Sequence, residues 1–161
     1  MKRLKFFLLA AMLILASGGP PLWGDVGTHV VSFDFLDINE IEVTGIPNLT
    51  ISSAIAGEQL QEVTDSSSTY GITTNGTNKR ITASIDTAMP AYVTLKVNVA
   101  APSGSGTSLG DVTLTTSGLN VVTGISQVAE SSLTITYKLS ATVQAGVLSS
   151  NTRTVTFTIS D

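Results

Sequence analysis

The chain has 161 residues, with eight Lys and Arg, twelve Asp and Glu, one His and no Cys, and its formal net charge is −4. This acidic balance argues against nucleic acid as a partner, because phosphates require a basic surface. The lack of cysteine excludes disulfides, thiol catalysis and thiolate metal sites. The length suits one domain with its own core, and the many Thr and Ser residues favour β-sheet over exposed helix.

The start of the chain has the layout of a secretory signal. Three basic residues lie within the first five positions, and an uncharged apolar run over residues 6–16 follows them. The run is shorter than the roughly 20 residues that a membrane-spanning helix needs. We predict a signal peptide over residues 1–18, with 24 as the alternative end, and a secreted, extracellular or cell-surface protein. A retained membrane anchor is the competing interpretation.

Cleavage after residue 18 removes three basic residues and no acidic one, so the net charge falls from −4 to −7. Residues 19–27, with Pro20, Pro21 and Gly24, then form a short, extended lead-in. The remainder, residues 28–161, is predicted to be a single β-sandwich domain.

From residue 28 onward, apolar and polar residues alternate in short runs, which is the period of half-buried strands. In chain order these runs are Val31–Phe35, Ile41–Val43, Leu49–Ile51, Tyr70–Ile72, Ile81–Ile85, Val93–Val97, Val112–Leu114, Val121–Ile125, Leu133–Leu139 and Val155–Ile159. Their number and spacing predict an all-β fold, an immunoglobulin-like antiparallel β-sandwich of about 8–10 strands.

The segment Asn75–Asn78 lies between two of these runs. A register with Thr74 opposite Lys79 makes it the loop of a hairpin, in which Gly76 and Asn78 are able to take positive φ. We therefore predict that the two flanking strands pair with each other.

Catalytic constellations are missing from the sequence. Nucleophilic triads and His-based metal sites would all depend on the single histidine, His29, which falls in the predicted first strand. We interpret His29 as a strand-surface residue and predict that the protein is not an enzyme.

The densest polar chemistry lies between residues 34 and 42. Its oxygen-bearing side chains are Asp34, Asp37, Asn39, Glu40 and Glu42. Such oxygens suit Ca²⁺, which takes about six to eight of them. The spacing lacks the glycine and closing glutamate of the helix-loop-helix calcium loop. Calcium binding by these residues is therefore one hypothesis, and a solvated acidic strand face followed by a turn is the alternative.

Both ends of the predicted domain have strand patterns with three apolar side chains on one face. They are Val31, Phe33 and Phe35 within Thr28–Leu36, and Val155, Phe157 and Ile159 within Arg153–Ser160. Such a strand either closes its own sheet or is exchanged between subunits by adding to a neighbour's open edge. No lysine or proline guards the second strand between Thr154 and Ser160. The first strand is the better donor, because it follows the lead-in.

The stretches INEIEVTG and ITTNGTNKRITASI, together with the leader and the Thr/Ser-rich strands, are similar to small exported bacterial proteins. The chain resembles the subunits from which bacteria build surface fibres and pili, although it lacks the cysteine pair and near-terminal tyrosine of chaperone-usher pilins. The resemblance implies a non-enzymatic structural or adhesive surface protein, a fibre subunit that assembles with copies of itself by β-strand addition. The alternative is a carbohydrate- or ligand-binding β-sandwich module stabilised by calcium.

Overall fold

A computed structural model of the chain describes residues 24–161. The predicted signal peptide and most of the predicted lead-in therefore lie outside the described residues. The chain divides into two units, Met1–Asp34 and Phe35–Asp161. In the first unit, the described residues 24–34 are exposed and form neither helix nor strand. No helix within residues 24–161 has the length and apolar character that crossing a bilayer requires.

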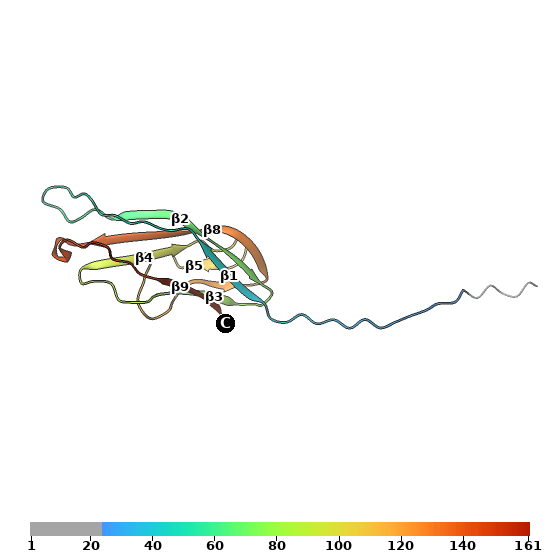
Figure 1. Ribbon diagram of the computed structural model, residues 1–161. Helices are drawn as coiled ribbons and strands as arrows, with labels where there is room; N and C mark the ends of the chain where they lie inside the picture. Colours follow the sequence, from blue (N-terminus) through green and yellow to red (C-terminus); the bar gives the residue numbers. More distant parts are fainter. Residues whose placement is uncertain (1–23) are drawn as a thin grey trace, which may run out of the picture. The chain divides into compact units, whose positions relative to one another are not determined.

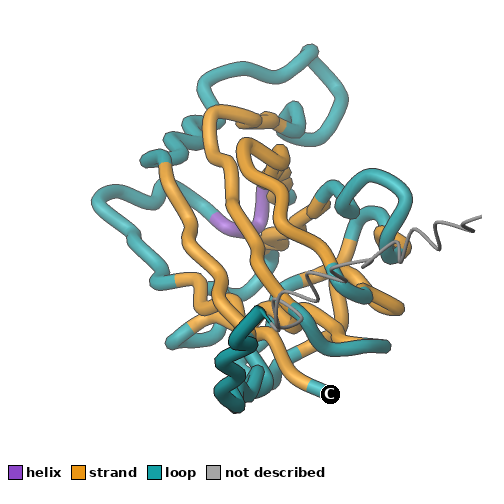
Figure 2. Tube along the Cα trace, turned by 90° about the vertical axis from the view of Figure 1, so that its right-hand side faces the viewer, coloured by secondary structure: helices purple, strands orange, loops and turns teal. Residues whose placement is uncertain are grey.

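The second unit contains nine strands and one short 3-10 helix, which is the purple segment of Figure 2. The strands are β1 (Asn39–Thr44), β2 (Val63–Thr74), β3 (Lys79–Ile85), β4 (Val93–Val99), β5 (Thr107–Ser108), β6 (Val112–Thr113), β7 (Leu119–Ile125), β8 (Val128–Ala141) and β9 (Val155–Ser160). The 3-10 helix η1 (Val143–Ala145) follows β8.

The strands form two antiparallel sheets that pack as a β-sandwich (Figure 1). One sheet has five strands in the order β1-β2-β8-β4-β6, and the other has four in the order β5-β7-β3-β9. The predicted all-β sandwich is confirmed, and the nine strands of the described region lie within the predicted range.

The core lies between the sheets and follows from the period-2 alternation. In β3, for example, residues 79, 81, 83 and 85 are buried, while the residues between them are exposed or half-buried. Burying one such aliphatic side chain stabilises the fold by about 1.5–3 kcal/mol before ordering costs. The core side chains with 0% exposure are Ile81, Ala83, Val97, Val121, Val122, Ile125 and Ile135.

The predicted hairpin around residues 75–78 is wrong, because β2 and β3 belong to different sheets. Ile72 lies opposite Ile41 of β1, whereas Ile81 lies opposite Ile159 of β9. The segment is still the connecting loop, and Asn78 has the expected positive φ of 53°. The loop leads from the five-stranded sheet to the four-stranded sheet. An alternating pattern does not indicate whether the next strand joins the same sheet or the other one.

Two predicted strands do not form. Residues 28–36, including His29, contain no strand, and the first strand begins at Asn39. The run at Leu49–Ile51 lies in the long β1–β2 connection, whose only pairing is an isolated bridge between Ala54 and Leu60. Alternation supplies an apolar face, but a strand also requires a regular ladder of backbone hydrogen bonds, which an alternating pattern does not guarantee.

The strand β9 pairs with β3 of its own chain in a continuous antiparallel register from Ile85–Val155 to Arg80–Ser160. Val155, Phe157 and Ile159 are half-buried and pack against the core, while Thr156 and Thr158 are exposed. The predicted facing of this strand is therefore correct, and its apolar side chains are covered within the same chain.

Candidate functional site

The five oxygen-bearing residues between positions 34 and 42 do not share one environment. Asp34 belongs to the first unit, whereas Asp37, Asn39, Glu40 and Glu42 belong to the second. Asp37 and Asn39 are in contact, since the Asn39 Nδ2 donates to Asp37 Oδ2 at 2.8 Å. Glu40 and Glu42 are exposed on β1. Among residues 24–161 no group of three or more His, Asp or Glu side chains could hold a metal ion, and the calcium hypothesis stays a prediction.

Asp37 has a cation as its partner. The Lys79 Nζ donates to Asp37 Oδ2 at 3.0 Å and also to Asp161 Oδ1. The lysine side chain is only 6% exposed, while the two aspartates are 58% and 90% exposed. A buried ammonium is thus neutralised by two carboxylates at the surface, one just before β1 and one just after β9.

The electrostatics of this group follow from its hydrogen bonds. The bond from Lys79, followed by the bond from Asn39, lowers the pKa of Asp37 below its ordinary value of 3.8. The bonds to Asp161 and Asp37 raise the pKa of Lys79 above 10.5 against the opposing effect of burial. Asp37 and Lys79 are therefore charged at neutral pH, and this arrangement offers neither a general base nor a nucleophilic amine.

The loop after β2 completes this end of the sandwich. The Asn75 side chain accepts from the Ile38 backbone N–H at 2.8 Å and donates to the Leu36 carbonyl at 2.7 Å. A Cβ on Gly76 would lie 2.3 Å from Lys79 Cε, so glycine provides the space through which the lysine passes. We call Asp37, Asn75, Gly76, Lys79 and Asp161 the lysine cluster, and its contacts are those of a structural tie.

Sequence reasoning missed Lys79, although its signal is present. The alternation of β3 places Lys79 on the same face as Ile81, Ala83 and Ile85, and that face is buried. A lysine on a core-facing position requires a carboxylate partner. The identity of those partners was not readable, because Asp37 and Asp161 are 42 and 82 residues away in the sequence.

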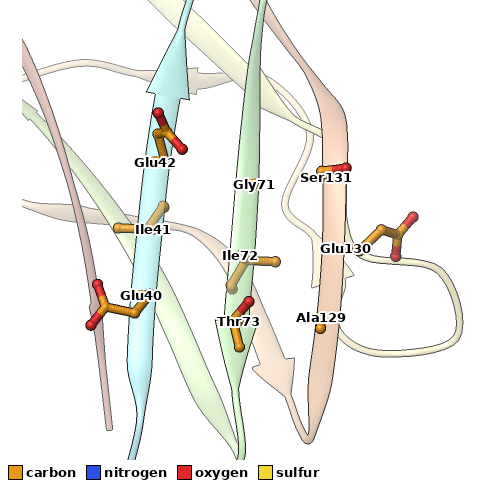
Figure 3. Close-up of a pocket in the computed structure, with 9 residues that line it drawn as sticks. All are labelled: Glu40, Ile41, Glu42, Gly71, Ile72, Thr73, Ala129, Glu130 and Ser131. Carbon is orange, nitrogen blue, oxygen red and sulfur yellow. The ribbon is translucent and has the colours of Figure 1, made fainter.

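A shallow hollow of about 480 Å³ lies on β1, β2 and β8 (Figure 3). Its lining includes three small residues, Gly71 on β2 and Ala129 and Ser131 on β8. Glu40 and Glu42 border it on β1, whereas the Glu130 carboxylate binds the backbone N–H and hydroxyl of Ser103 at 2.7 and 2.9 Å. The hollow is acidic and open, and its residues do not form a catalytic arrangement.

The edges of the sandwich are the other functional candidates. β9 is the last strand of the four-stranded sheet, and its outer side has no strand partner within residues 24–161. The predicted donor segment has exposed side chains, with Val31, Phe33 and Phe35 exposed by 68, 77 and 83%.

No family model, curated protein or solved structure matches this chain.

Proposed function

We propose that this chain is an exported, non-enzymatic structural subunit of a bacterial surface fibre, and that copies join by β-strand addition. In this proposal residues 1–18 are the signal peptide, and Thr28–Leu36 of one copy pairs with β9 of the next. The protein acts outside the cell or at its surface, and its partner is a second copy of the same chain.

The main support for this proposal is that one chain contains both a segment with the pattern of a strand to donate and an edge strand that could accept it. Residues 28–36 alternate apolar and polar side chains as a strand does, yet they form no strand in the described structure. β9 is an edge strand of six residues without lysine or proline. Edge strands that lack such guards are templates for pairing with another chain, and main-chain hydrogen bonds supply the affinity.

The lysine cluster favours exchange between copies over pairing within one copy. Asp37 and Asp161 both bind Lys79, so the segment before Asp37 and the strand β9 reach the same end of the sandwich. Residues 28–36 laid back on their own β9 would therefore run parallel to it. A segment from a second copy can run antiparallel, like every strand pair of both sheets. Parallel pairing is the slightly less stable of the two.

The proposal includes an immunoglobulin-like relationship. The order β1-β2-β8-β4 corresponds to strands A, B, E and D of an immunoglobulin sheet if β8 is taken as E and β4 as D. With β9 then taken as F beside β3 as C, the second sheet departs from that plan, because within the described residues no strand lies beyond β9, where an immunoglobulin domain has strand G.

Size-exclusion chromatography and electron microscopy of the secreted protein test the assembly. We expect oligomers or fibres from the protein with residues 25–36 and monomers from the protein without them. A synthetic peptide of residues 25–36 should bind to the shortened protein. A full secreted protein that stays strictly monomeric at every concentration overturns the proposal.

Because the chain has no cysteine, introduced cysteines report the pairing directly. One preparation carries Ser32→Cys and another carries Thr158→Cys, and the two are mixed under oxidising conditions. We expect a disulfide between copies. In a protein that carries both substitutions, a disulfide that forms only within single chains would mean that each copy pairs with its own β9.

A further inference from the structure

The end of β8 lies on the left in Figure 1. A larger cavity, of about 690 Å³, is lined by residues from this end of β8 and from the connection that follows it. It is lined by β4 and β8 of the five-stranded sheet, by the first residue of β9 and by parts of three loops. Its volume is in the range of small-molecule sites in proteins. All of its lining residues belong to the unit Phe35–Asp161.

The cavity exists because the two sheets differ in length at this end. The four-stranded sheet stops at the pair Ile85–Val155, whereas β8 continues to Ala141 and pairs there with Val93 of β4. Leu95 and Leu139, which lie opposite each other on β4 and β8, line the cavity. Loops cover them in place of a strand, and the space between remains unfilled.

The interior of the cavity is mainly apolar. Its apolar lining residues come from the β4–β8 pair, from β9 and from the covering loops. The main apolar residues are Leu49, Ile51, Met89, Leu95, Leu139 and Val155. An apolar group of a ligand would be removed from water here.

Tyr137 adds a polar group to this interior. Its side chain lines the cavity and is only 5% exposed, and its hydroxyl has no hydrogen bond within residues 24–161. The hydroxyl of Tyr70, the other buried tyrosine of the described region, donates to the Ala100 carbonyl at 2.5 Å. Burial raises the pKa of Tyr137 to about 12, so its hydroxyl is protonated and able to donate at neutral pH.

Arg153 adds a fixed positive charge among the lining residues. Its guanidinium donates to the Ala88 carbonyl through Nε and Nη2, and to the Thr152 carbonyl through Nη1. It forms no ion pair with a carboxylate in the described part of the chain. Since a guanidinium has five N–H donors, two remain for a ligand, and its charge is not compensated.

We propose that this cavity binds a small amphiphile with an anionic head, specifically an alkyl carboxylate such as a fatty acid. The alkyl chain fills the space between the sheets, the carboxylate pairs with Arg153, and Tyr137 donates a hydrogen bond to an oxygen of the ligand. This proposal does not depend on fibre assembly, because the cavity and the lysine cluster lie at opposite ends of the sandwich.

The test uses displacement of dansyl-labelled undecanoate from the secreted protein by dodecanoate, followed by fluorescence. We expect saturable displacement by dodecanoate and weaker displacement by dodecanol, which lacks the charge. The variant Arg153→Gln should weaken dodecanoate binding about tenfold or more, as loss of a charged hydrogen bond does. The variant Tyr137→Phe should weaken it several-fold and leave the melting temperature in the absence of ligand nearly unchanged.

Two matched variants serve as controls. Arg80→Gln removes an exposed arginine of β3, and Tyr92→Phe alters a tyrosine that is 62% exposed, and neither lines the cavity. A second set of displacement measurements uses anionic phospholipid vesicles whose acyl chains are dodecanoyl esters. Comparison of the vesicles with free dodecanoate shows whether the ligand is a free acid or a membrane lipid. The proposal is overturned if dodecanoate does not displace the probe, if dodecanol competes equally well, or if Arg153→Gln behaves like Arg80→Gln.

Discussion

Gly45 and Gly57 share a backbone conformation and differ in what surrounds them. Both have φ in the left-handed region, at 102° for Gly45 and 90° for Gly57. A Cβ on Gly45 would lie 2.8 Å from Ser68 Cα and 2.9 Å from the Ser67 carbonyl oxygen, while a Cβ on Gly57 would meet nothing within 4 Å. A side chain at Gly57 would therefore cause backbone strain alone, whereas a side chain at Gly45 would cause the same strain and a steric clash as well.

We expect Gly57→Ala to reduce the free energy of unfolding by about 1–2 kcal/mol, because alanine is strained at this φ. Gly45→Ala should cost at least about 2 kcal/mol more, because the backbone of β2 must also move away from the end of β1. Urea unfolding followed by circular dichroism measures both. Equal losses for the two variants would mean that the contact between Gly45 and Ser68 does not restrict this position.

At the scale of elements, β9 combines a covered face with an open edge. Its apolar side chains are held against the core by pairing with β3, and its threonine face is exposed. If copies add a strand to this edge, as proposed, substitutions at the exposed positions of β9 should have little effect on the stability of the monomer. The same substitutions should weaken self-association.

We expect the double variant Thr156→Lys, Thr158→Lys to weaken self-association about tenfold or more, because lysines on an edge strand oppose pairing with another chain. The monomer should keep its stability within about 0.5 kcal/mol, since both positions are exposed. Thr134→Lys is the matched control, because Thr134 is exposed on β8, which is paired on both sides. Sedimentation velocity across a concentration series distinguishes them. Undiminished association of the double variant would exclude β9 as the acceptor edge.

At the scale of the whole molecule, the chain changes sheet at every connection from β2 to β9. Only β1 and β2 are successive strands in the same sheet. The two layers are therefore joined by seven crossings, and the lysine cluster reinforces this joining by linking β3 to residues beside β1 and β9. Such non-local pairing is typical of domains that fold in milliseconds to seconds.

The cluster predicts how stability depends on pH. The pKa of Asp37 in the folded state is below its ordinary 3.8, so its stabilising contribution is present above that pH and is lost as the pH falls through the folded value. The pKa of Lys79 is raised above 10.5, so its contribution is present below that pH and is lost as the pH rises through the folded value. Burial raises the pKa of Tyr70 and Tyr137, which acts in the same direction as Lys79 above about pH 10.

We therefore expect a plateau of melting temperature between about pH 5 and pH 9, with losses on both sides. Lys79→Met should lower the plateau by roughly 4 °C or more and should flatten the acid limb, because Asp37 loses the bond that lowers its pKa. Arg80→Met, at the next and exposed position of β3, is the control. Scanning calorimetry over pH measures both variants. An acid limb that Lys79→Met leaves unchanged would show that the limb comes from other carboxylates, such as Asp65 and Asp111, whose pKa values are also lowered.

The class of fold, the positions of most strands and the buried face of each were readable from the amino-acid sequence. These follow from alternation, which is a local property, and it holds even for Lys79 on the inner face of β3. The covered face of β9 was predicted in the same way, from Val155, Phe157 and Ile159.

Which strands are neighbours became clear only from the folded arrangement of the two sheets. Ile72 and Ile81 have the pattern of a hairpin, yet they lie in different sheets. Residues 28–36 have the pattern of a strand, yet they have no ladder within the described structure. The ion partners of Lys79 and the cavity beside Tyr137 depend on segments distant in sequence. The physical reason is that alternation fixes where a side chain points, whereas pairing depends on the path that the loops take between the layers.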